Sequence, residues 1–290
     1  MRVRCPSTGQ PYPDAVVAGN LGTDLVAGFH TTSFTVMWAR YDIARHPDMQ
    51  KRIAQELAVA GLLQVQGQPP ARELEWPDLT TASPYFNAVL KESMRLNPVA
   101  ATGTVREAPR DMELGGFPIP QGSRLWIPIH SLHLSTHNFS EPTSFQPERW
   151  LNQDSQSGTG QMVGQPSLSP TEAVSKSKVH DPLQEPLPES PSTPTPNACP
   201  YTVPGSKPTP KGNAAAPSKS MLPFSDGPRN CVGLNFANAN IRTVLLTILS
   251  RFWLELDPSI SNHEEVVKAQ ELSLVLTCSR PIQLALKPHL

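Results

Sequence analysis

The feature that most constrains the fold of this chain is a segment of 70 residues, 151–220, that lacks the composition of a folded domain. It holds 13 of the 33 prolines, and Tyr201 is its only aromatic residue. Such a segment cannot bury enough apolar surface to offset the entropy lost when its backbone becomes ordered. We therefore predict a disordered Pro/Ser-rich insertion over 151–220. The segments 1–150 and 221–290 are predicted to fold together as one domain.

Charge and cysteine content exclude several classes of protein. Lys and Arg number 24 against 25 Asp and Glu, so a net charge of −1 gives no electrostatic case for binding nucleic acid. No apolar run reaches the ~18 residues of a membrane span. The first 24 residues lack the basic and apolar regions of a signal peptide. No other segment of the sequence indicates a cellular location, which is therefore unknown. The four cysteines show no paired spacing, which predicts neither a disulfide framework nor a zinc site.

Apolar periodicity and the positions of proline predict a chain that is mainly α with small β-sheets. The strongest local signals are the lack of a proline in the first helix until Pro47, and the Ser83-Pro84 and Asn97-Pro98 pairs at the start and end of the third helix. Short apolar alternations and a Gly115-Gly116 turn favour strands. The predicted helices span 15–45, 47–63, 84–96 and 232–252, the predicted strands lie within 104–130, 272–277 and 282–286, and 137–150 is predicted to be coil.

The most informative segment, residues 224–233, reads FSDGPRNCVG. It is a Gly/Pro-rich turn that ends on Cys231 where a helix begins, and unpaired N–H groups at a helix start favour a thiolate. Gly227 and Gly233 allow the backbone to approach something flat and bulky, while Arg229 can neutralise a nearby anionic group. A lone thiolate without a second protein ligand suits haem iron. A buried structural cysteine is the commoner fate of a lone cysteine.

Four motifs together resemble the cytochrome P450 family, the haem-thiolate monooxygenases. Phe224-x-x-Gly227-x-Arg229-x-Cys231-x-Gly233 resembles the family's haem-binding loop, which is a highly specific signature. The other three are the ExxR motif of Glu92 to Arg95, the PERW element of residues 147–150 and the AGFHTT of residues 27–32, which resembles the family's oxygen-binding helix. The resemblance covers roughly 15–150 and 221–290 and implies the C-terminal, proximal half of the P450 fold.

This resemblance implies a cofactor and the residues that hold it. Cys231 would be the axial ligand of haem b, iron protoporphyrin IX, with Phe224, Gly227, Arg229 and Gly233 forming the loop around it. Arg106 stands where the family often places an arginine that binds a haem propionate, and Arg229 and His133 are further candidates for this contact. The alternative for Arg106 and His133 is an ordinary surface residue.

The resemblance also implies an ionic triad behind the haem. Glu92 and Arg95 share a helix face because they are three residues apart, and Arg149 of the PERW element would complete the triad. The triad would fix the cysteine loop and would do no chemistry itself. The alternative for a lone ExxR is a solvated surface pair that contributes little to stability.

The long predicted helix would bind dioxygen as co-substrate. Ala27 and Gly28 would let dioxygen approach the backbone, although small residues serve tight helix packing equally well. Thr31 would relay protons for O–O cleavage, and its alternative is a hydroxyl bonded back to its own helix. His30 stands where the family usually has Asp or Glu. Its imidazole could pass protons near neutral pH, or it could be a histidine without a catalytic part.

The implied function is a monooxygenase that takes electrons from an NADPH-dependent reductase or a ferredoxin and oxidises a small organic or lipid substrate. Chains of the family are much longer, so we expect a truncated product or one fragment of a longer chain. An anchor in the endoplasmic reticulum would be expected of a full-length relative. Two alternatives remain: a haem-thiolate hydroperoxide lyase or isomerase, against which Thr31 and the uninterrupted cysteine loop argue, and a non-catalytic fragment with weak or no haem binding.

Overall fold

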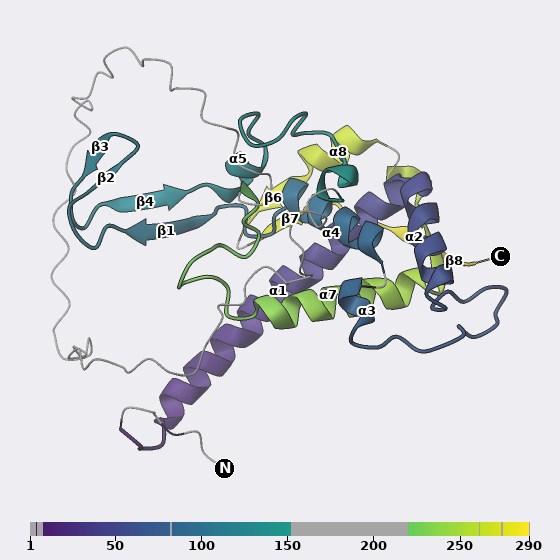
Figure 1. Ribbon diagram of the computed structural model, residues 1–290, viewed down its shortest axis with the longest axis horizontal. Coiled ribbons are helices and arrows are strands. Elements are labelled where there is room, and N and C mark those ends of the chain that lie inside the picture. The colour runs from purple at the N-terminus through teal and green to yellow at the C-terminus, as the bar shows by residue number, and fades with distance from the viewer. Residues whose placement is uncertain are drawn as a thin grey trace. The chain divides into compact units, whose positions relative to one another are not determined.

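The computed structural model describes residue 4 and residues 8–81, 83–151, 220–260, 262–273 and 275–289, all of which belong to one compact unit. Helices dominate this unit, and small antiparallel sheets lie beside them (Figure 1). Residues 152–219, which make up nearly all of the predicted insertion, lie outside the described residues.

The longest element is helix α1, Asp14–Arg45, which runs unbroken because no proline occurs between Pro13 and Pro47. Its C-terminal third is buried, whereas Leu25 and Phe29 in the N-terminal half are 72% and 63% exposed. Figure 1 shows this half, in purple, extending beyond the elements that pack on the other end of the helix. Among the described residues, no helix combines the length and apolar composition that crossing a membrane requires.

Three helices pack with the buried end of α1 to form the main core. They are α2 (Pro47–Val59), α4 (Pro84–Leu96) and α7 (Leu234–Leu249), and α7 lies beside α1 in Figure 1. Both α2 and α4 begin on a proline, which is tolerated in the first turn of a helix. The core residues include Ala39, Ile43, Ile53, Leu57, Phe86, Val89, Leu90, Leu245 and Leu246.

Glu56 of α2 caps the start of α4. Its carboxylate accepts hydrogen bonds from the backbone N–H groups of Tyr85, at 2.9 Å, and Phe86, at 3.2 Å. The first N–H groups of a helix have no partner within the helix, so an acidic side chain from a neighbouring helix can accept their hydrogen bonds. Its negative charge also interacts favourably with the positive end of the helix dipole. This contact fixes α4, which carries the ExxR motif, against α2.

Every described strand belongs to a two-stranded antiparallel sheet. The first hairpin pairs β1 with β4, and a smaller hairpin of β2 and β3 is inserted in its connection. Gly115 and Gly116 form the β2–β3 turn with φ angles of 58° and 84°, which glycine adopts without steric cost. The strands are β1 Thr104–Glu107, β2 Met112–Leu114, β3 Phe117–Ile119, β4 Arg124–Ile127, β5 Phe252–Leu256 with β8 Leu284–Pro288, and β6 Gln270–Leu272 with β7 Leu276–Cys278.

The structure confirms the mainly α class and the long helices but moves several boundaries. The second helix ends at Val59 because Gly61 follows in the left-handed region, with φ 72°. The last predicted helix ends at Leu249, and the apolar residues after it form β5. Elements that the sequence pattern did not predict are α3 Asp78–Thr81, α5 Ile129–His133, the 3₁₀ turns η1 Pro147–Trp150 and η2 Pro258–Ile260, and α8 His263–Lys268.

Candidate functional site: a cysteine loop and a buried ionic network

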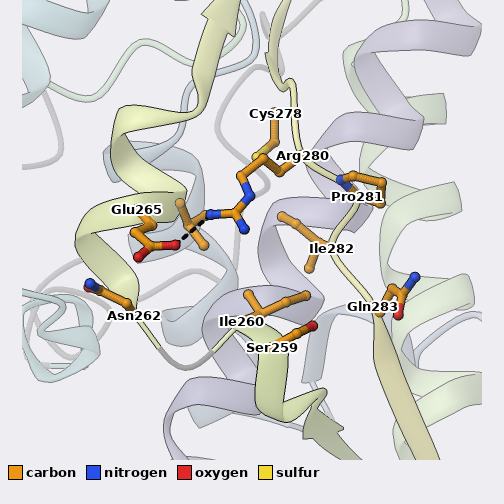
Figure 2. Close-up of a pocket in the computed structure, with 10 residues that line it drawn as sticks. Ser259, Ile260, Asn262, Glu265, Cys278, Arg280, Pro281, Ile282 and Gln283 are labelled. Carbon is orange, nitrogen blue, oxygen red and sulfur yellow. Dashed lines mark hydrogen bonds and ion pairs between the residues drawn. The ribbon is translucent and has the colours of Figure 1, made fainter.

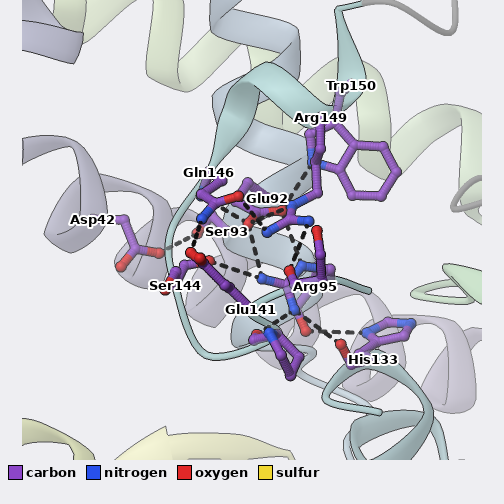
Figure 3. A network of polar contacts seen from close by, with 12 residues as sticks. Asp42, Glu92, Ser93, Arg95, His133, Glu141, Ser144, Gln146, Arg149 and Trp150 are labelled. Carbon is purple, nitrogen blue, oxygen red and sulfur yellow. Dashed lines mark hydrogen bonds and ion pairs between the residues drawn. The ribbon is translucent and has the colours of Figure 1, made fainter. Parts of the chain in front are cut away.

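Glu92 is the centre of a buried polar network on α4 (Figure 3). Its carboxylate is fully buried and accepts two hydrogen bonds from Arg95, at 2.8 and 2.9 Å, and one from Arg149, at 3.1 Å. The Trp150 indole and the Gln146 backbone N–H also donate to it, each at 2.9 Å. The structure therefore brings the three residues of the expected triad together in a buried setting, with five donors around one carboxylate.

Arg95 uses all five of its N–H donors in this network. Besides Glu92, it donates to the backbone carbonyl oxygens of His133 (2.9 Å), Pro142 (2.6 Å) and Ser144 (3.1 Å). The guanidinium presents these donors in a rigid planar fork. One fully buried side chain thus fixes the last carbonyl of α5 and two loop carbonyls relative to α4.

The cysteine loop is a compact turn that leads into α7. The Cys231 N–H donates to the Phe224 carbonyl oxygen at 3.0 Å, which closes the loop, and Gly227 at its tip has φ 78°. The Phe224 ring packs against the main core. Gly233 is the N-cap residue of α7, and Cys231 is an exposed free cysteine. The loop therefore presents a sulfur atom to the surroundings from a backbone that is anchored on the core.

Arg106 lies at this loop. It extends from β1 and donates to Ser225 Oγ at 3.0 Å and to the Asp226 carbonyl oxygen at 3.3 Å. Arg229 lies within the loop itself and is exposed. Two guanidinium groups therefore belong to the cysteine loop or contact it directly, which is the pairing that the sequence suggested for two haem carboxylates.

His133 has a different place from the one expected. It is completely buried, Nε2 accepts the Leu222 N–H at 2.8 Å, and Nδ1 is 3.1 Å from the Arg95 carbonyl oxygen. Burial and the nearby Arg95 charge lower its pKa to about 4, which keeps the ring neutral at physiological pH. The prediction of a haem-carboxylate contact at His133 does not fit this geometry, because both ring nitrogens already bind backbone atoms.

A second buried carboxylate, Asp42 of α1, was not singled out by its sequence. It accepts hydrogen bonds from Ser93 Oγ at 2.7 Å and from Asn97 Nδ2 at 3.1 Å, both on or next to α4. Burial raises its pKa to about 7, although these hydrogen bonds and Arg45 oppose the shift. Trp150 and Gln146 were likewise missed as partners of Glu92, although Trp150 stands in the PERW motif that pointed to Arg149.

The α1 residues that the resemblance associates with dioxygen lie on a helix surface that is largely uncovered in the described chain. Ala27, Gly28 and His30 are exposed, and a Cβ atom placed on Gly28 would meet no atom within 4 Å, so these small residues do not serve helix packing here. Thr31 is half-buried, and its hydroxyl donates to the Ala27 carbonyl oxygen at 2.6 Å, which is the alternative that the sequence left open. The His30 ring lies in contact with Phe29 and Phe34.

A cavity of about 200 Å³ lies between α8 and the segment after β7, and no residue of the cysteine loop lines it (Figure 2). Arg280 and Glu265 form an ion pair at its edge, and Cys278 contributes to its wall. Ligand pockets commonly measure about 300–1,000 Å³. This cavity is smaller and none of the predicted site residues line it, so the candidate site remains the cysteine loop with the network behind it.

Comparison with known proteins matches most of this chain to one protein family. The family model "Cytochrome P450" matches residues 7–163 and 207–285. "Cytochrome P450 3A11" of Mus musculus is 28% identical over 228 residues, which is 79% of this chain and 32% of that protein. "Probable cytochrome P450 4d20" of Drosophila melanogaster is 36% identical over 148 residues, or 51% of this chain and 28% of that protein. The chain thus spans about a third of the length of the curated relatives it matches.

Solved structures share the fold. "Crystal structure of a Cytochrome P450 (CYP102L1)" superposes with a TM-score of 0.65 and 19% identity, over 98% of this chain and 48% of that one. "Zebra fish cytochrome P450 another structure with Abiraterone" gives a TM-score of 0.60 with 21% identity, over 92% of this chain and 46% of that one. The described elements therefore correspond to about half of such a fold.

Proposed function

The chain belongs to the cytochrome P450 family, and from that premise we propose that it carries the haem-thiolate half of a monooxygenase. The proposed reaction places one atom of dioxygen in a small organic or lipid substrate and reduces the other to water. Two electrons come from a separate reductase or ferredoxin. The observation that carries this proposal is the free, exposed Cys231 on a loop anchored by Phe224 and Arg106.

The residues present fit a haem group. Cys231 offers one sulfur ligand, and among the described residues no cluster of three or more His, Cys, Asp or Glu competes for a metal ion. Arg106 and Arg229 place two guanidinium charges at the same loop, which suits the two carboxylates of a haem. When bound through a thiolate, haem supplies the activation of dioxygen that this reaction needs.

The protein's own contribution behind the loop is positioning. The side chains of Glu92 and Arg95 are fully buried and that of Arg149 is 9% exposed, so a ligand cannot reach them. We propose that they act by holding the backbone in place. Arg95 binds three carbonyl oxygens of the segment 133–144, and Phe224 seats the cysteine loop on the core. A preorganised loop keeps the sulfur in one place without reorganisation when a ligand binds.

On helix α1, Thr31 and His30 are the proposed proton carriers. The Thr31 hydroxyl donates a hydrogen bond to the Ala27 carbonyl oxygen and keeps its acceptor lone pairs, so it can accept a hydrogen bond from a bound water. His30 is exposed, so its imidazole is open to solvent on this helix. We propose that this imidazole supplies protons where relatives would use a carboxylic acid.

A second candidate is a fragment that binds haem weakly and has no activity. One observation favours it: Leu21, Leu25 and Phe29, spaced four residues apart on α1, are 64%, 72% and 63% exposed. Residues at this spacing form a single apolar stripe. If nothing covers the stripe, water reaches this side of any bound group, and a site open to water holds its ligand and its chemistry poorly.

Haem reconstitution separates the two candidates. We expect the purified chain to take up haemin and, after reduction under carbon monoxide, to show the strongly red-shifted Soret band of thiolate ligation. Cys231→Ser should abolish that band, whereas Cys278→Ser, which removes the half-buried cysteine of β7, should leave it unchanged. Haem uptake without the red shift, or a red shift that survives Cys231→Ser, would overturn the proposal, and failure of the soluble chain to take up haem would favour the fragment.

A further inference from the structure

We propose that His133 is a positioning residue that clamps the cysteine loop onto the buried Glu92 network. The inference rests on the proposed function for its purpose, but its geometry is independent of any ligand. His133 ends helix α5, is completely buried and contacts backbone on two sides. Figure 3 shows its ring beside Arg95, on the side of the network away from Trp150.

The two ring nitrogens bind groups of opposite kind. The Leu222 N–H can only donate, so Nε2, at 2.8 Å, must accept and carries no proton. The neutral ring then carries its proton on Nδ1, which donates to the Arg95 carbonyl oxygen at 3.1 Å. One tautomer therefore satisfies both contacts. A second proton would set Nε2–H against the Leu222 N–H and add a charge next to Arg95 and near His130.

On the network side, the contact between His133 and Arg95 is reciprocal. His133 Nδ1 binds the Arg95 carbonyl oxygen, while Arg95 Nη1 donates to the His133 carbonyl oxygen at 2.9 Å. Because the Arg95 guanidinium is itself held by both oxygens of Glu92, the position of the imidazole is fixed by α4 on one side and by α5 on the other. A buried side chain held in this way has little freedom to rotate.

On the loop side, the clamp acts at Leu222, two residues before the cysteine loop begins. Leu222 donates to His133, and its own carbonyl oxygen accepts the Ser225 N–H at 3.1 Å. Two residues further on, the Phe224 carbonyl oxygen accepts the Cys231 N–H. The path from Arg95 to the sulfur-bearing residue thus consists of one side chain and a short stretch of hydrogen-bonded backbone.

Two substitutions separate the halves of the clamp. His133→Gln places its amide near the position of Nε2 and can still accept the Leu222 N–H. The shorter His133→Asn reaches only the position of Nδ1 and can bind only the Arg95 carbonyl oxygen. Ser93→Ala is the matched control, because it also removes a buried hydrogen bond next to Glu92 but its hydroxyl binds Asp42 and does not touch the loop.

Amide hydrogen exchange of the haem-free full chain is the primary test. We expect slow exchange at Leu222 in the wild type, about tenfold faster exchange at Leu222 in His133→Asn, and near wild-type exchange there in His133→Gln and Ser93→Ala. Fast exchange at Leu222 in the wild type overturns the clamp even if His133→Asn does not fold. Equal exchange in His133→Asn and the wild type, or an equal increase in Ser93→Ala, also overturns it.

A spectroscopic measurement then tests the purpose of the clamp. In haem-loaded chains reduced under carbon monoxide, His133→Asn should lower the fraction that shows the red-shifted Soret band, and His133→Gln should restore it. An unchanged fraction in His133→Asn would overturn a role in positioning the sulfur. If no variant takes up haem, the proposed function fails, while the exchange measurement still decides whether the clamp exists.

Discussion

The buried carboxylate of Asp42 predicts an unusual dependence of stability on pH. Asp42 is 2% exposed and its pKa is raised from 3.8 to about 7. Between these two values the folded chain keeps the proton that the unfolded chain has lost. Linkage then requires stability to fall as pH rises through this window, and the whole penalty is present above about pH 7.

The magnitude follows from the size of the shift. A difference of about three pH units corresponds to about 4 kcal/mol at about 1.4 kcal/mol for each unit. Asp42→Asn replaces the carboxyl by a neutral group of the same shape, which can still accept from Ser93 or Asn97. We expect the stability difference between Asp42→Asn and the wild type to increase by about 4 kcal/mol in favour of the variant from about pH 4 to about pH 8.

Urea unfolding followed by tryptophan fluorescence at fixed salt, in steps of pH, measures this difference. Asp78→Asn is the control of opposite sign, because the bidentate contact with Arg72 lowers the pKa of Asp78. Its carboxylate stabilises the fold above pH 3.8 and loses that effect as pH falls below it, so Asp78→Asn should be most destabilising near neutral pH. A pH-independent difference for Asp42→Asn would refute the assignment of a buried, protonated Asp42.

Two further pairs of substitutions, each with its own control, test the fold around the site. Gly103→Ala should lower the free energy of unfolding by well over 2 kcal/mol, because at φ 88° the added Cβ would lie 1.9 Å from the Ile127 carbonyl oxygen. Its control is Gly122→Ala, which has φ 80° but open space around it and should cost only about 1 kcal/mol. Thermal unfolding measures both. Glu92→Gln should cost about 3–5 kcal/mol in urea unfolding because it removes the countercharge of the fully buried Arg95 guanidinium. Glu148→Gln, which removes an exposed pair with Arg52, should change stability by less than about 1 kcal/mol, and equal effects of the two would contradict the importance of burial.

Local signals in the sequence were sufficient for the helices that carry the site. Pro13 and Pro47 delimit α1, and Ser83-Pro84 with Asn97-Pro98 delimits α4, so their bounds could be predicted to within a residue. The contact of Arg149 with Glu92 was also anticipated, because two family motifs pointed to the same network. In each case the deciding information lies within a few residues of the chain or in a recognised motif.

Contacts between distant segments could not be predicted in the same way. The family resemblance suggested His133 as a ligand-binding residue. Its actual partner Leu222 lies 89 residues further along the chain, and no pattern near either residue indicates that contact. The apolar residues after Leu249 continue the helical pattern, but they form β5 because β8 at the end of the chain supplies the pairing strand. Nothing in the sequence around Asp42 indicates that it is buried, because its partners Ser93 and Asn97 lie more than 50 residues further along the chain.

Iron K-edge X-ray absorption of the haem-loaded chain tests the central claim most directly, because it reports the atoms bound to the metal. A haem held by Cys231 should show one sulfur atom in the first shell of the iron, and the matched Cys231→Ser sample should show none. A first shell of nitrogen and oxygen alone in the wild type, or a sulfur signal that persists after Cys231→Ser, would contradict the account.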